Sequence, residues 1–428
     1  MRHIAVIGAG ITGITTAYAL QARGFDVTVF DRNRYAAMAT SFANGGQLSA
    51  SNAEVWNRWA TVLKGLKWML APGAPLLVNP RPSLHKFGWM AEFMANIPKY
   101  RQNTLDTVRM AIAARAHLLE HAAAEGIDFA CETRGILHVY HTKKEFDHAT
   151  GVTALMAKGG LVRRAVSPEE IRAIEPTLKA PLYGGYYAES DFTGDIHAYA
   201  RGLSAACVRR GATVRYGVTV DRLRHGADGV RVAWRDASGV AAEALFDGVV
   251  VAAGVESRAF ARQLGDRVNI YPVKGYSITV ALDDADSQAA APWVSLLDDE
   301  AKVVSSRLGR NRFRIAGTAE FNGRNLDIRD DRIRPLVQWC EHLFPDVSTE
   351  FATPWAGLRP MMPDMMPRVG PGRRPGVFYN TGHGHLGWTL AAATAECVAD
   401  AVAAAPARSK TPGPKGRLQP TAPAESVS

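Results

Sequence analysis

The chain has 428 residues, of which 47% are apolar and 21% charged, a composition that excludes a wholly disordered protein. Its length favours two or three domains, and no apolar run reaches the roughly 18–20 residues of a membrane-spanning helix. The formal net charge of +9 indicates an anionic partner, a membrane surface or a surplus spread thinly over the surface. No basic recognition helix or nucleic-acid motif accounts for it, so we expect no nucleic-acid partner.

The N-terminus carries the pattern of a strand, a helix and a second strand, at residues 2–7, 14–22 and 26–30. Between the first strand and the helix lies the motif Gly8-x-Gly10-x-x-Gly13, and the second strand ends at Asp31. Gly8 permits a tight turn, Gly10 lets the backbone approach a pyrophosphate, and Gly13 lets helix and strand pack closely. The helix N-terminus favours phosphates, and Asp31 stands where a carboxylate accepts ribose hydroxyls. This context predicts a dinucleotide site; the alternative is a glycine turn of another α/β protein.

The rest of the chain alternates between helical and strand patterns and contains no internal repeat. Residues 37–52 are small and polar and are predicted to form a loop, as are the Pro-, Gly- and Met-rich residues 352–378. Further helices are expected at 104–125, 143–158, 197–210, 330–344 and 386–404. Further strands are expected at 135–140, 212–223, 229–235, 248–252, 268–282 and 302–318.

The four cysteines and the N-terminus indicate a reducing compartment. No CxxC occurs, so neither a disulfide framework nor a zinc site is expected, and each cysteine is interpreted as a buried thiol (Cys131, Cys207, Cys340 and Cys397). The chain passes from Met1 straight into a strand, without the apolar segment of a signal peptide. We therefore expect a cytoplasmic protein.

Two later segments favour a flavin over a nicotinamide cofactor. Residues 249–254 (VVVAAG) read as a late buried strand that can return to the first sheet and bring Gly254 near the dinucleotide. Residues 380–390 (NTGHGHLGWTL) form a glycine-rich loop that leads into a helix, whose start carries partial positive charge. A reduced flavin gathers negative charge at its N1–C2=O edge, so it suits this loop; the alternative is a simple turn.

These segments together resemble the D-amino acid dehydrogenase family, within the wider group of FAD-dependent amine oxidoreductases. The resemblance runs from residue 1 to about 403 and is carried by Gly8–Gly13 with Asp31, SFANGGQLS (41–49), YPVKGYSITV (271–280), WAGLRPMMPD (355–364) and NTGHGHLGWTLA (380–391). It implies an α/β fold, with a Rossmann-type, doubly wound FAD-binding domain and an interleaved substrate domain built on an antiparallel sheet. The expected FAD domain is 1–90, 143–265 and 350–405, the substrate domain 91–142 and 266–349, and the disordered tail 406–428.

Arg359 matches the position at which the family binds the substrate carboxylate, and a guanidinium suits this role because it makes two parallel hydrogen bonds. Lys274 and Tyr276 are two residues apart on a strand, so both are expected to face the same side, either flavin and substrate or the sheet interior. His383 completes the candidate catalytic residues. His383 and His385 lack further ligands nearby, so no metal site is expected; the family usually has a small residue at position 385.

The expected cofactor is FAD, held without a covalent bond because no cysteine occurs in 355–364. The candidate FAD-binding residues lie in the segments named above and at one position that contacts adenine in relatives. They are Gly8, Gly10, Ile11, Thr12, Gly13, Asp31, Arg32, Ser41, Asn44, Gly45, Gly46, Gln47, Val220, Ala253, Gly254, Gly382, His383, Gly384, His385, Leu386 and Gly387.

The resemblance implies oxidative deamination of a D-amino acid to a 2-oxo acid and ammonia, with electrons passed to a quinone or another respiratory acceptor. Three alternatives stay open: a cyclic or N-substituted substrate such as D-hydroxyproline or D-proline, an oxygen-using oxidase, and a non-catalytic flavin electron-transfer subunit. The basic, apolar stretch 63–70 (LKGLKWML) indicates either a peripheral contact with the inner face of the cell membrane or ordinary helix packing.

Overall fold

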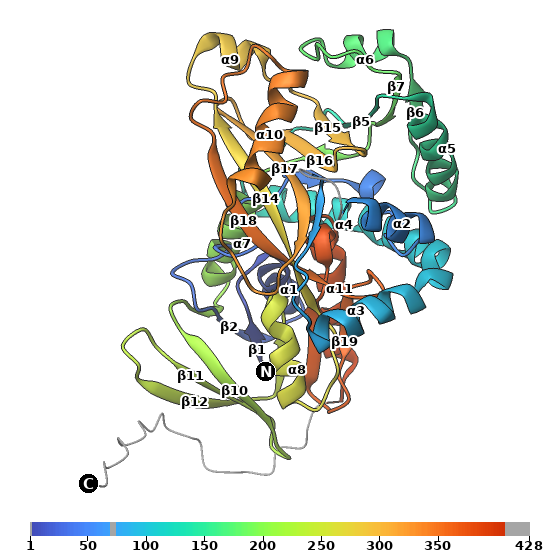
Figure 1. Ribbon diagram of the computed structural model, residues 1–428. Coiled ribbons are helices and arrows are strands. Elements are labelled where there is room, and N and C mark those ends of the chain that lie inside the picture. The colour runs from blue at the N-terminus through green and yellow to red at the C-terminus, as the bar shows by residue number, and fades with distance from the viewer. Residues whose placement is uncertain (1, 69–73, 407–428) are drawn as a thin grey trace, which may run out of the picture.

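The computed structural model describes residues 2–68 and 74–406, whose two main β-sheets follow one another along the long axis of the molecule (Figure 1). The smaller sheet has the strand order β19-β20-β13-β1-β2-β9, and every pair in it is parallel except β19 with β20. Its strands are β1 (His3–Ile7), β2 (Asp26–Phe30), β9 (Thr213–Arg215), β13 (Gly248–Val251), β19 (Arg368–Pro371) and β20 (Val377–Thr381). The sheet thus combines the beginning, the middle and the end of the chain.

Because side chains alternate between the two sides of a strand, the two faces of this sheet pack against different elements. Ile4 and Val6 face a core shared with the helices α1 (Ile11–Ala22), α7 (Ile196–Arg209) and α11 (Gly387–Ala404). Ala5 and Ile7 face a second core, shared with α8 (Ser257–Gln263) and a meander of β10 (Thr219–His225), β11 (Val230–Arg235) and β12 (Ala241–Phe246). Helices therefore cover one face, and mostly strands cover the other.

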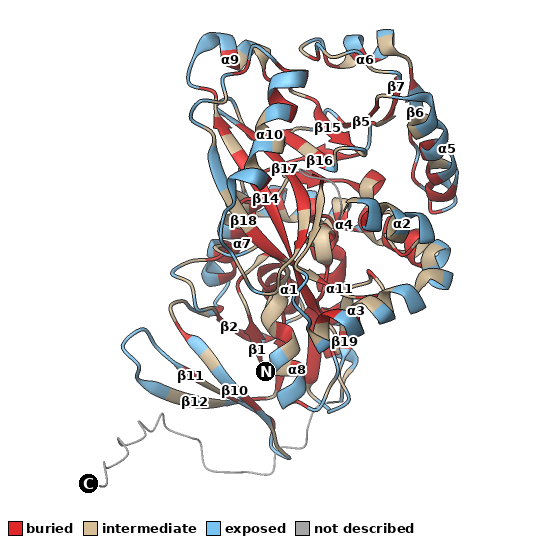
Figure 2. Ribbon diagram, viewed as in Figure 1, coloured by how far each residue is buried: buried red, intermediate tan, exposed pale blue. Residues whose placement is uncertain are grey.

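The larger sheet is mainly antiparallel and has the order β18-β14-β17-β16-β15-β5-β7-β6, with β4 added beside β17. Its strands are β4 (Leu76–Val78), β5 (Ile136–Tyr140), β6 (Arg164–Val166), β7 (Gly184–Ala188), β14 (Tyr271–Ala281), β15 (Ser295–Asp298), β16 (Val303–Arg307), β17 (Arg312–Phe321) and β18 (Thr353–Met361). Leu336 and Trp339 of α10 (Asp330–Leu343) pack against Phe313 and Ile315 on one face, and Figure 2 shows these central strands as largely buried.

The remaining elements are mostly helices around the two main sheets, with α6 (Pro168–Ile174) and α9 (Ala285–Ala290) at the far end of the larger one (Figure 1). The long helix α4 (Tyr100–Glu125) packs against α11 and α7 and ends at Gly126, which adopts the left-handed conformation that glycine tolerates. The other elements are β3 (Gln47–Leu48), which pairs with β8 (Phe192–Thr193), and the helices α2 (Trp59–Trp68), α3 (Leu84–Ala95) and α5 (Lys143–Ala157). Short 3₁₀ turns lie at Ala50–Asn52, Ile97–Lys99, Gly254–Glu256 and Gly384–Leu386.

The loop expected at 352–378 is the clearest error in the predicted elements, because it contains β18 and β19. β18 pairs with β14 along its whole length, from Thr353 opposite Thr279 to Met361 opposite Tyr271. Its prolines and glycines suggested irregular structure, but a long partner strand supplies the hydrogen bonds that define it. The strand expected at 212–223 is in fact two, β9 and β10, in different sheets.

Sheet pairing also places several segments differently from the expected domain ranges. β6 and β7 lie in 143–265 and β18 in 350–405, yet all three belong to the larger sheet. Helix α4 lies mostly in 91–142 but packs on the helices of the smaller sheet. The expected tail lies outside the described residues except for residue 406. Of the four cysteines, which are all free, Cys207 and Cys340 are buried as expected, whereas Cys131 is half-buried and Cys397 exposed.

Candidate active site

A cavity of about 1650 Å³ lies between the two sheets and collects nearly all of the predicted site residues. Its wall includes the end of β1, the start of α1, the loop at 39–47, strand β18 and the start of α11. Every candidate catalytic or cofactor residue lines it except Gly13 and Lys274. Segments far apart in sequence therefore form one site.

The glycine turn has the geometry that its spacing predicted. Gly8 adopts φ +109°, and a Cβ there would lie 2.6 Å from the carbonyl oxygen of Ala252 in the neighbouring segment. A Cβ on Gly13 would lie 1.8 Å from the carbonyl oxygen of Gly8, so Gly13 serves packing and does not reach the cavity. Gly10 caps α1 without a side-chain hydrogen bond, so the helix start can receive a phosphate.

Asp31 holds the glycine turn from the end of β2. Its Oδ2 accepts a hydrogen bond from the Ala9 backbone (2.7 Å), and its Oδ1 accepts from the backbone and side chain of Asn33 (2.8 and 2.9 Å). Asp31 and the exposed Arg32 both line the cavity, and Arg32 lies 3.7 Å from Glu256. The carboxylate therefore orders the turn as well as facing the expected ribose position.

The loop at 41–47 is fixed against the larger sheet. A Cβ on Gly45 would lie 2.4 Å from a methyl group of Val304, and the Gly45 carbonyl accepts a hydrogen bond from Ser306 (2.7 Å). Gln47 donates to Ser295 (2.8 Å) and to the Leu296 carbonyl (2.9 Å), while its Oε1 is buried without a partner among the described residues. The loop thus presents backbone groups and one free amide oxygen to the cavity.

The loop after β20 brings the second helix start to the same cavity. Gly382 and Gly384 adopt positive φ (+80° and +59°) and lie against Met362 and Met361, where a Cβ would come within 2.7 Å of each side chain. Helix α11 then begins at Gly387 without a side-chain cap. His383 lines the cavity, but its Nε2 lies 2.9 Å from the Thr394 hydroxyl in α11, which fixes the ring within the loop.

Arg359 enters the cavity from β18 with no counter-charge. Its Nη1 donates to the Thr318 carbonyl (2.7 Å) and its Nη2 to the Gly317 carbonyl (3.4 Å), and no described carboxylate lies within 4.0 Å. Burial without such a partner lowers the pKa of Arg359 to about 10. A ligand carboxylate would supply the missing charge.

Lys274 and Tyr276 face the same side of β14, as their spacing predicted, but they are tied to other residues. The Lys274 ammonium is fully buried and lies 3.3 Å from Glu320, and it donates to Asn325 (2.8 Å) and to the Asp327 carbonyl (3.0 Å). The Tyr276 hydroxyl donates to the same Glu320 carboxylate (2.5 Å). Lys274 does not line the cavity, so we withdraw it from the candidate catalytic residues; Tyr276 lines it with its hydroxyl already paired.

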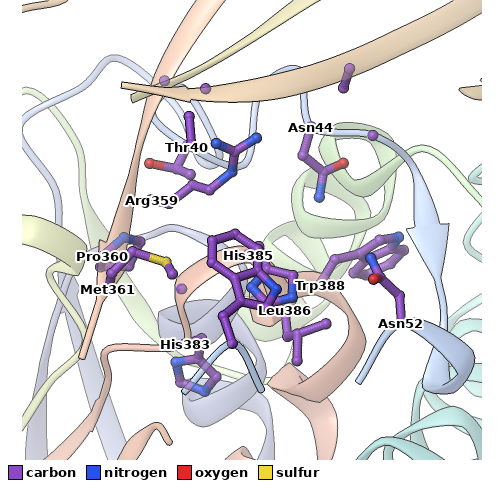
Figure 3. Close-up of a pocket in the computed structure, with 18 of the residues that line it drawn as sticks. Thr40, Asn44, Asn52, Arg359, Pro360, Met361, His383, His385, Leu386 and Trp388 are labelled. Atoms are coloured by element: carbon purple, nitrogen blue, oxygen red, sulfur yellow. The ribbon is translucent and has the colours of Figure 1, made fainter. Parts of the chain in front are cut away.

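His385 lies at the centre of the cavity, below Arg359 in Figure 3. Its ring stacks on Trp56 with centroids 4.5 Å apart. Both ring nitrogens are buried and have no hydrogen-bond partner of standard geometry among the described residues, and the backbone of Asn52 lies nearby. Burial and the nearby Arg359 lower the pKa of His385 to about 3, so the ring is neutral and free to bind a ligand.

Several polar residues of the cavity, among them Thr318, Lys302 and Trp388, were not among the predicted site residues, and of these three only Trp388 lies within a segment quoted for the site (380–390). Thr318 adopts φ +59°, a strained conformation for a β-branched residue, and its hydroxyl is buried without a partner. The indole N–H of Trp388 is likewise buried and unpaired, and Lys302, Asp299 and Arg163 also line the cavity.

The cavity fits a dinucleotide with a flavin. Two helix starts without an N-cap side chain face it, with the Ile11 N–H of α1 bonded to the Ser41 hydroxyl (3.2 Å). Five of its lining residues carry buried polar atoms without partners in the described chain: Gln47, Arg163, Thr318, His385 and Trp388. A pyrophosphate, ribose hydroxyls and the polar edge of an isoalloxazine ring supply complementary groups.

The family model of FAD dependent oxidoreductases (DAO) matches residues 3–401, and the chain belongs to this family of flavoenzymes. Among its relatives, "D-amino acid dehydrogenase 3" of Mesorhizobium japonicum is 61% identical over 403 residues, covering 94% of this chain and 97% of the relative. "D-amino acid dehydrogenase" of Paramagnetospirillum magneticum is 42% identical over 412 residues, covering 94% and 95%. The family and its FAD cofactor, inferred from the sequence motifs, are thereby confirmed.

Solved structures confirm the Rossmann-type fold. Glycine oxidase from Geobacillus kaustophilus superposes with a TM-score of 0.72 at 20% identity, covering 94% of this chain and 95% of that one. L-proline dehydrogenase from P. horikoshii superposes with a TM-score of 0.71 at 16% identity, covering 93% and 92%. At these identities the likeness concerns the fold alone.

Proposed function

We propose that this enzyme oxidises D-amino acids to 2-oxo acids and ammonia. The observation that carries the proposal is the Arg359 guanidinium, which faces the cavity with no carboxylate of its own. A guanidinium binds a carboxylate through two parallel charge-assisted hydrogen bonds and so fixes its orientation. The relatives named D-amino acid dehydrogenase support the choice of substrate.

Substrate positioning falls to Arg359 and His385. With the carboxylate on Arg359, the amino group lies within the same part of the cavity, where a neutral imidazole with free nitrogens can accept its hydrogen bond. Bound FAD supplies the hydride acceptor for the Cα hydrogen, and the imino acid left behind hydrolyses in water. The helix starts of α1 and α11 and the 41–47 loop would hold FAD, without a covalent bond.

None of Lys274, His383 and His385 is suited to act as a base at this position. The Lys274 ammonium faces away and is paired, and burial lowers the pKa of both His383 and His385 to about 3. The substrate amine therefore enters already deprotonated, and the site works by orientation and by the positive potential of the α11 start.

We further propose that the electrons pass to a quinone or another respiratory acceptor, at the inner face of the cell membrane. Six large apolar side chains are exposed on α2 and α3: Trp59, Leu63, Leu66, Leu84, Phe87 and Met94. Three of them, Leu63, Leu66 and Met94, also line the cavity. The helices of the described residues include none long and apolar enough to cross a bilayer. Residues 69 and 70 of the predicted 63–70 patch lie outside the described residues.

The experiment that tests the reaction is anaerobic. The purified flavoprotein is mixed with D-amino acids, L-amino acids, D-proline and D-hydroxyproline one at a time, and flavin absorbance is followed. Bleaching by D- but not L-amino acids supports the proposal; bleaching by the cyclic imino acids alone would favour the first alternative, and no bleaching would contradict turnover of all of them. Hydrogen peroxide formed in air would identify an oxygen-using oxidase.

Acceptor and membrane contact are tested separately. We expect a water-soluble quinone to reoxidise the enzyme, and the enzyme to sediment with anionic vesicles. The double variant Leu63→Glu, Leu66→Glu should sediment less while retaining anaerobic bleaching, and Val240→Glu, at another exposed apolar residue, serves as the matched control. Equal sedimentation of both variants and the wild type would argue against contact through α2.

A further inference from the structure

Two of the four arginines in the described cavity wall have no carboxylate partner. Arg58 lies 2.6 Å from Glu54, and Arg32 lies 3.7 Å from Glu256. Arg359 and Arg163, in contrast, have no carboxylate within 4.0 Å among the residues that the structure describes. Arg359 is explained by the substrate carboxylate, whereas Arg163 is not.

Arg163 is a buried cation held by neutral groups. Its side chain belongs to a residue that is 8% exposed, and its Nη1 donates to the Ser51 carbonyl (3.1 Å) while its Nη2 lies 3.5 Å from the Tyr140 hydroxyl. Its Nε is buried without a partner. Burying a charge without a counter-charge costs folding free energy. An anion bound from outside the chain would offset this cost at the Arg163 guanidinium.

Lys302 lies near both arginines, because its charge acts together with that of Arg163 on His138 and together with that of Arg359 on His385. The Lys302 ammonium pairs with Asp299 (2.5 Å). The positive charge of Arg163 also acts to lower the pKa of the Asp299 carboxyl. The Lys302 carbonyl lies 2.8 Å from where a Cβ of Gly317 would stand, and the carbonyl of Gly317 accepts a hydrogen bond from Arg359. Lys302 also adopts φ +55°, a strained conformation found often at functional sites.

The Ser51 segment provides a second link between the two arginines. Ser51 binds Arg163, and the next residue, Asn52, lies beside the ring of His385, which in turn lies near Arg359. Three cations, Arg359, Lys302 and Arg163, thus occupy this part of the cavity with the carboxylate of Asp299. Glu54 and Glu300, whose charges also act on Lys302, are paired with Arg58 and Lys64. One positive charge remains when a substrate carboxylate has neutralised Arg359.

We propose that Lys302 and Arg163 form a subsite for an anionic side chain, so that the enzyme prefers D-amino acids whose side chain ends in a carboxylate. The proposal rests on the proposed function, in which Arg359 holds the α-carboxylate. Asp299 positions the Lys302 ammonium by pairing with it. The preference is electrostatic and should weaken as salt concentration rises.

The test compares each acidic substrate with its amide, which has nearly the same shape and no charge. We expect kcat/KM for D-glutamate over D-glutamine, and for D-aspartate over D-asparagine, to favour the acid by about tenfold or more. In Arg163→Met this ratio should fall toward one, and Arg163→Lys should restore part of it. Arg164→Met, at an exposed neighbour paired with Glu170 and Glu189, should keep the wild-type ratio. FAD content and thermal unfolding show whether each variant folds.

A wild-type enzyme that uses the amides as well as the acids would overturn the subsite, without the need for any variant. So would an Arg163→Met enzyme that slows all substrates equally and keeps the ratio, since that marks a structural role. If neutral D-amino acids bleach the flavin but the acids have no advantage, only the subsite fails. If no D-amino acid bleaches it, the proposed function fails and the subsite with it.

Discussion

The guanidinium of Arg359 lies directly on the backbone of Gly275: a Cβ built on Gly275 would stand 2.3 Å from the guanidinium carbon. The two residues lie on adjacent strands, β18 and β14, in which Arg359 pairs with Val273 and Gly275 with Gly357. The absence of a side chain at position 275 thus leaves the space in which the arginine extends toward the carbonyls of β17.

Gly275→Ala should therefore weaken substrate binding indirectly, through the position of Arg359. The added methyl group displaces Arg359, so we expect KM for a D-amino acid to rise by about tenfold or more while FAD stays bound. Steady-state kinetics and the flavin spectrum provide the measurement. Gly151→Ala, on α5 with no atom within 4 Å of the added Cβ, should change neither; an unchanged KM in Gly275→Ala would contradict the assigned contact.

Substitutions of Arg359 itself test separately how its charge and its planar guanidinium contribute to substrate binding. Arg359→Ala removes two charge-assisted hydrogen bonds and should raise KM by about 30- to 100-fold, with flavin retained. Arg359→Lys keeps a positive charge but loses the planar fork, so its KM should lie between those of the wild type and the alanine variant. If Arg359→Ala has the wild-type KM, another group binds the carboxylate.

Gly13 and Gly10 should respond differently to the same substitution. A Cβ on Gly13 would stand 1.8 Å from the Gly8 carbonyl oxygen, so Gly13→Ala should destabilise the protein by more than about 2 kcal/mol and reduce its FAD content. The nearest atom to a Cβ on Gly10 is the Ser41 hydroxyl at 3.6 Å, so Gly10→Ala should fold normally and bind FAD more weakly. Thermal unfolding and flavin titration distinguish the two; similar melting losses would refute the distinction.

The pH dependence of kcat/KM should follow the substrate and not a histidine of the enzyme. Burial lowers the pKa of His383 and His385 to about 3, so neither changes charge between about pH 5 and pH 9. The value of kcat/KM should rise with pH until the amino group of the substrate is deprotonated. The pH at which this rise occurs should shift between substrates whose amino groups differ in pKa. An apparent pKa near 6.5 in the pH profile of kcat/KM, unchanged from one substrate to the next, would indicate that a group of the enzyme acts as the base.

Stability should depend on pH through His141 and Asp298, which are 2.9 Å apart. The hydrogen bond to Asp298 raises the pKa of His141 above 6.5. Burial acts to raise the pKa of Asp298, but the hydrogen bonds from His141, the Ala301 backbone and Trp339 lower it overall. The pair therefore stabilises the fold between the ordinary pKa values of the two groups, and its contribution declines as pH rises through the raised value of His141.

The melting temperature should accordingly fall by about 1–2 °C between about pH 6 and pH 8.5. His141→Gln should remove most of this decline, whereas His148→Gln, at another exposed histidine, should keep it. Differential scanning fluorimetry measures both. A decline of equal size in His141→Gln would exclude the pair as its source.

The local part of this architecture could be predicted from the sequence. Gly8 to Asp31 form one continuous unit, so glycine spacing and strand pattern define it without knowledge of distant partners. The loop at 380–390 is similar, because it leads from a strand into a helix within a few residues. The residues that the motifs grouped around the dinucleotide accordingly line one cavity.

The remainder depends on contacts between distant segments. Alternation correctly placed Lys274 and Tyr276 on one side of β14, but only the position of Glu320 on β17 decides which side carries their partners. Thr318 on β17 meets Arg359 on β18 through strand register, and no short motif records a register. The Pro- and Gly-rich β18 likewise becomes recognisable as a strand only beside β14.

The strand order of the smaller sheet has a consequence for biosynthesis. β1 begins at His3, while its sheet is completed by β20, which ends at Thr381, and α11 covers the same core. The glycine turn at Gly8–Gly13 therefore leaves the ribosome long before β20 and α11, which complete the site around it. FAD capture must follow release of nearly the whole chain, and a nascent chain stalled before residue 377 displays an open sheet edge on β13 that invites chaperones or aggregation.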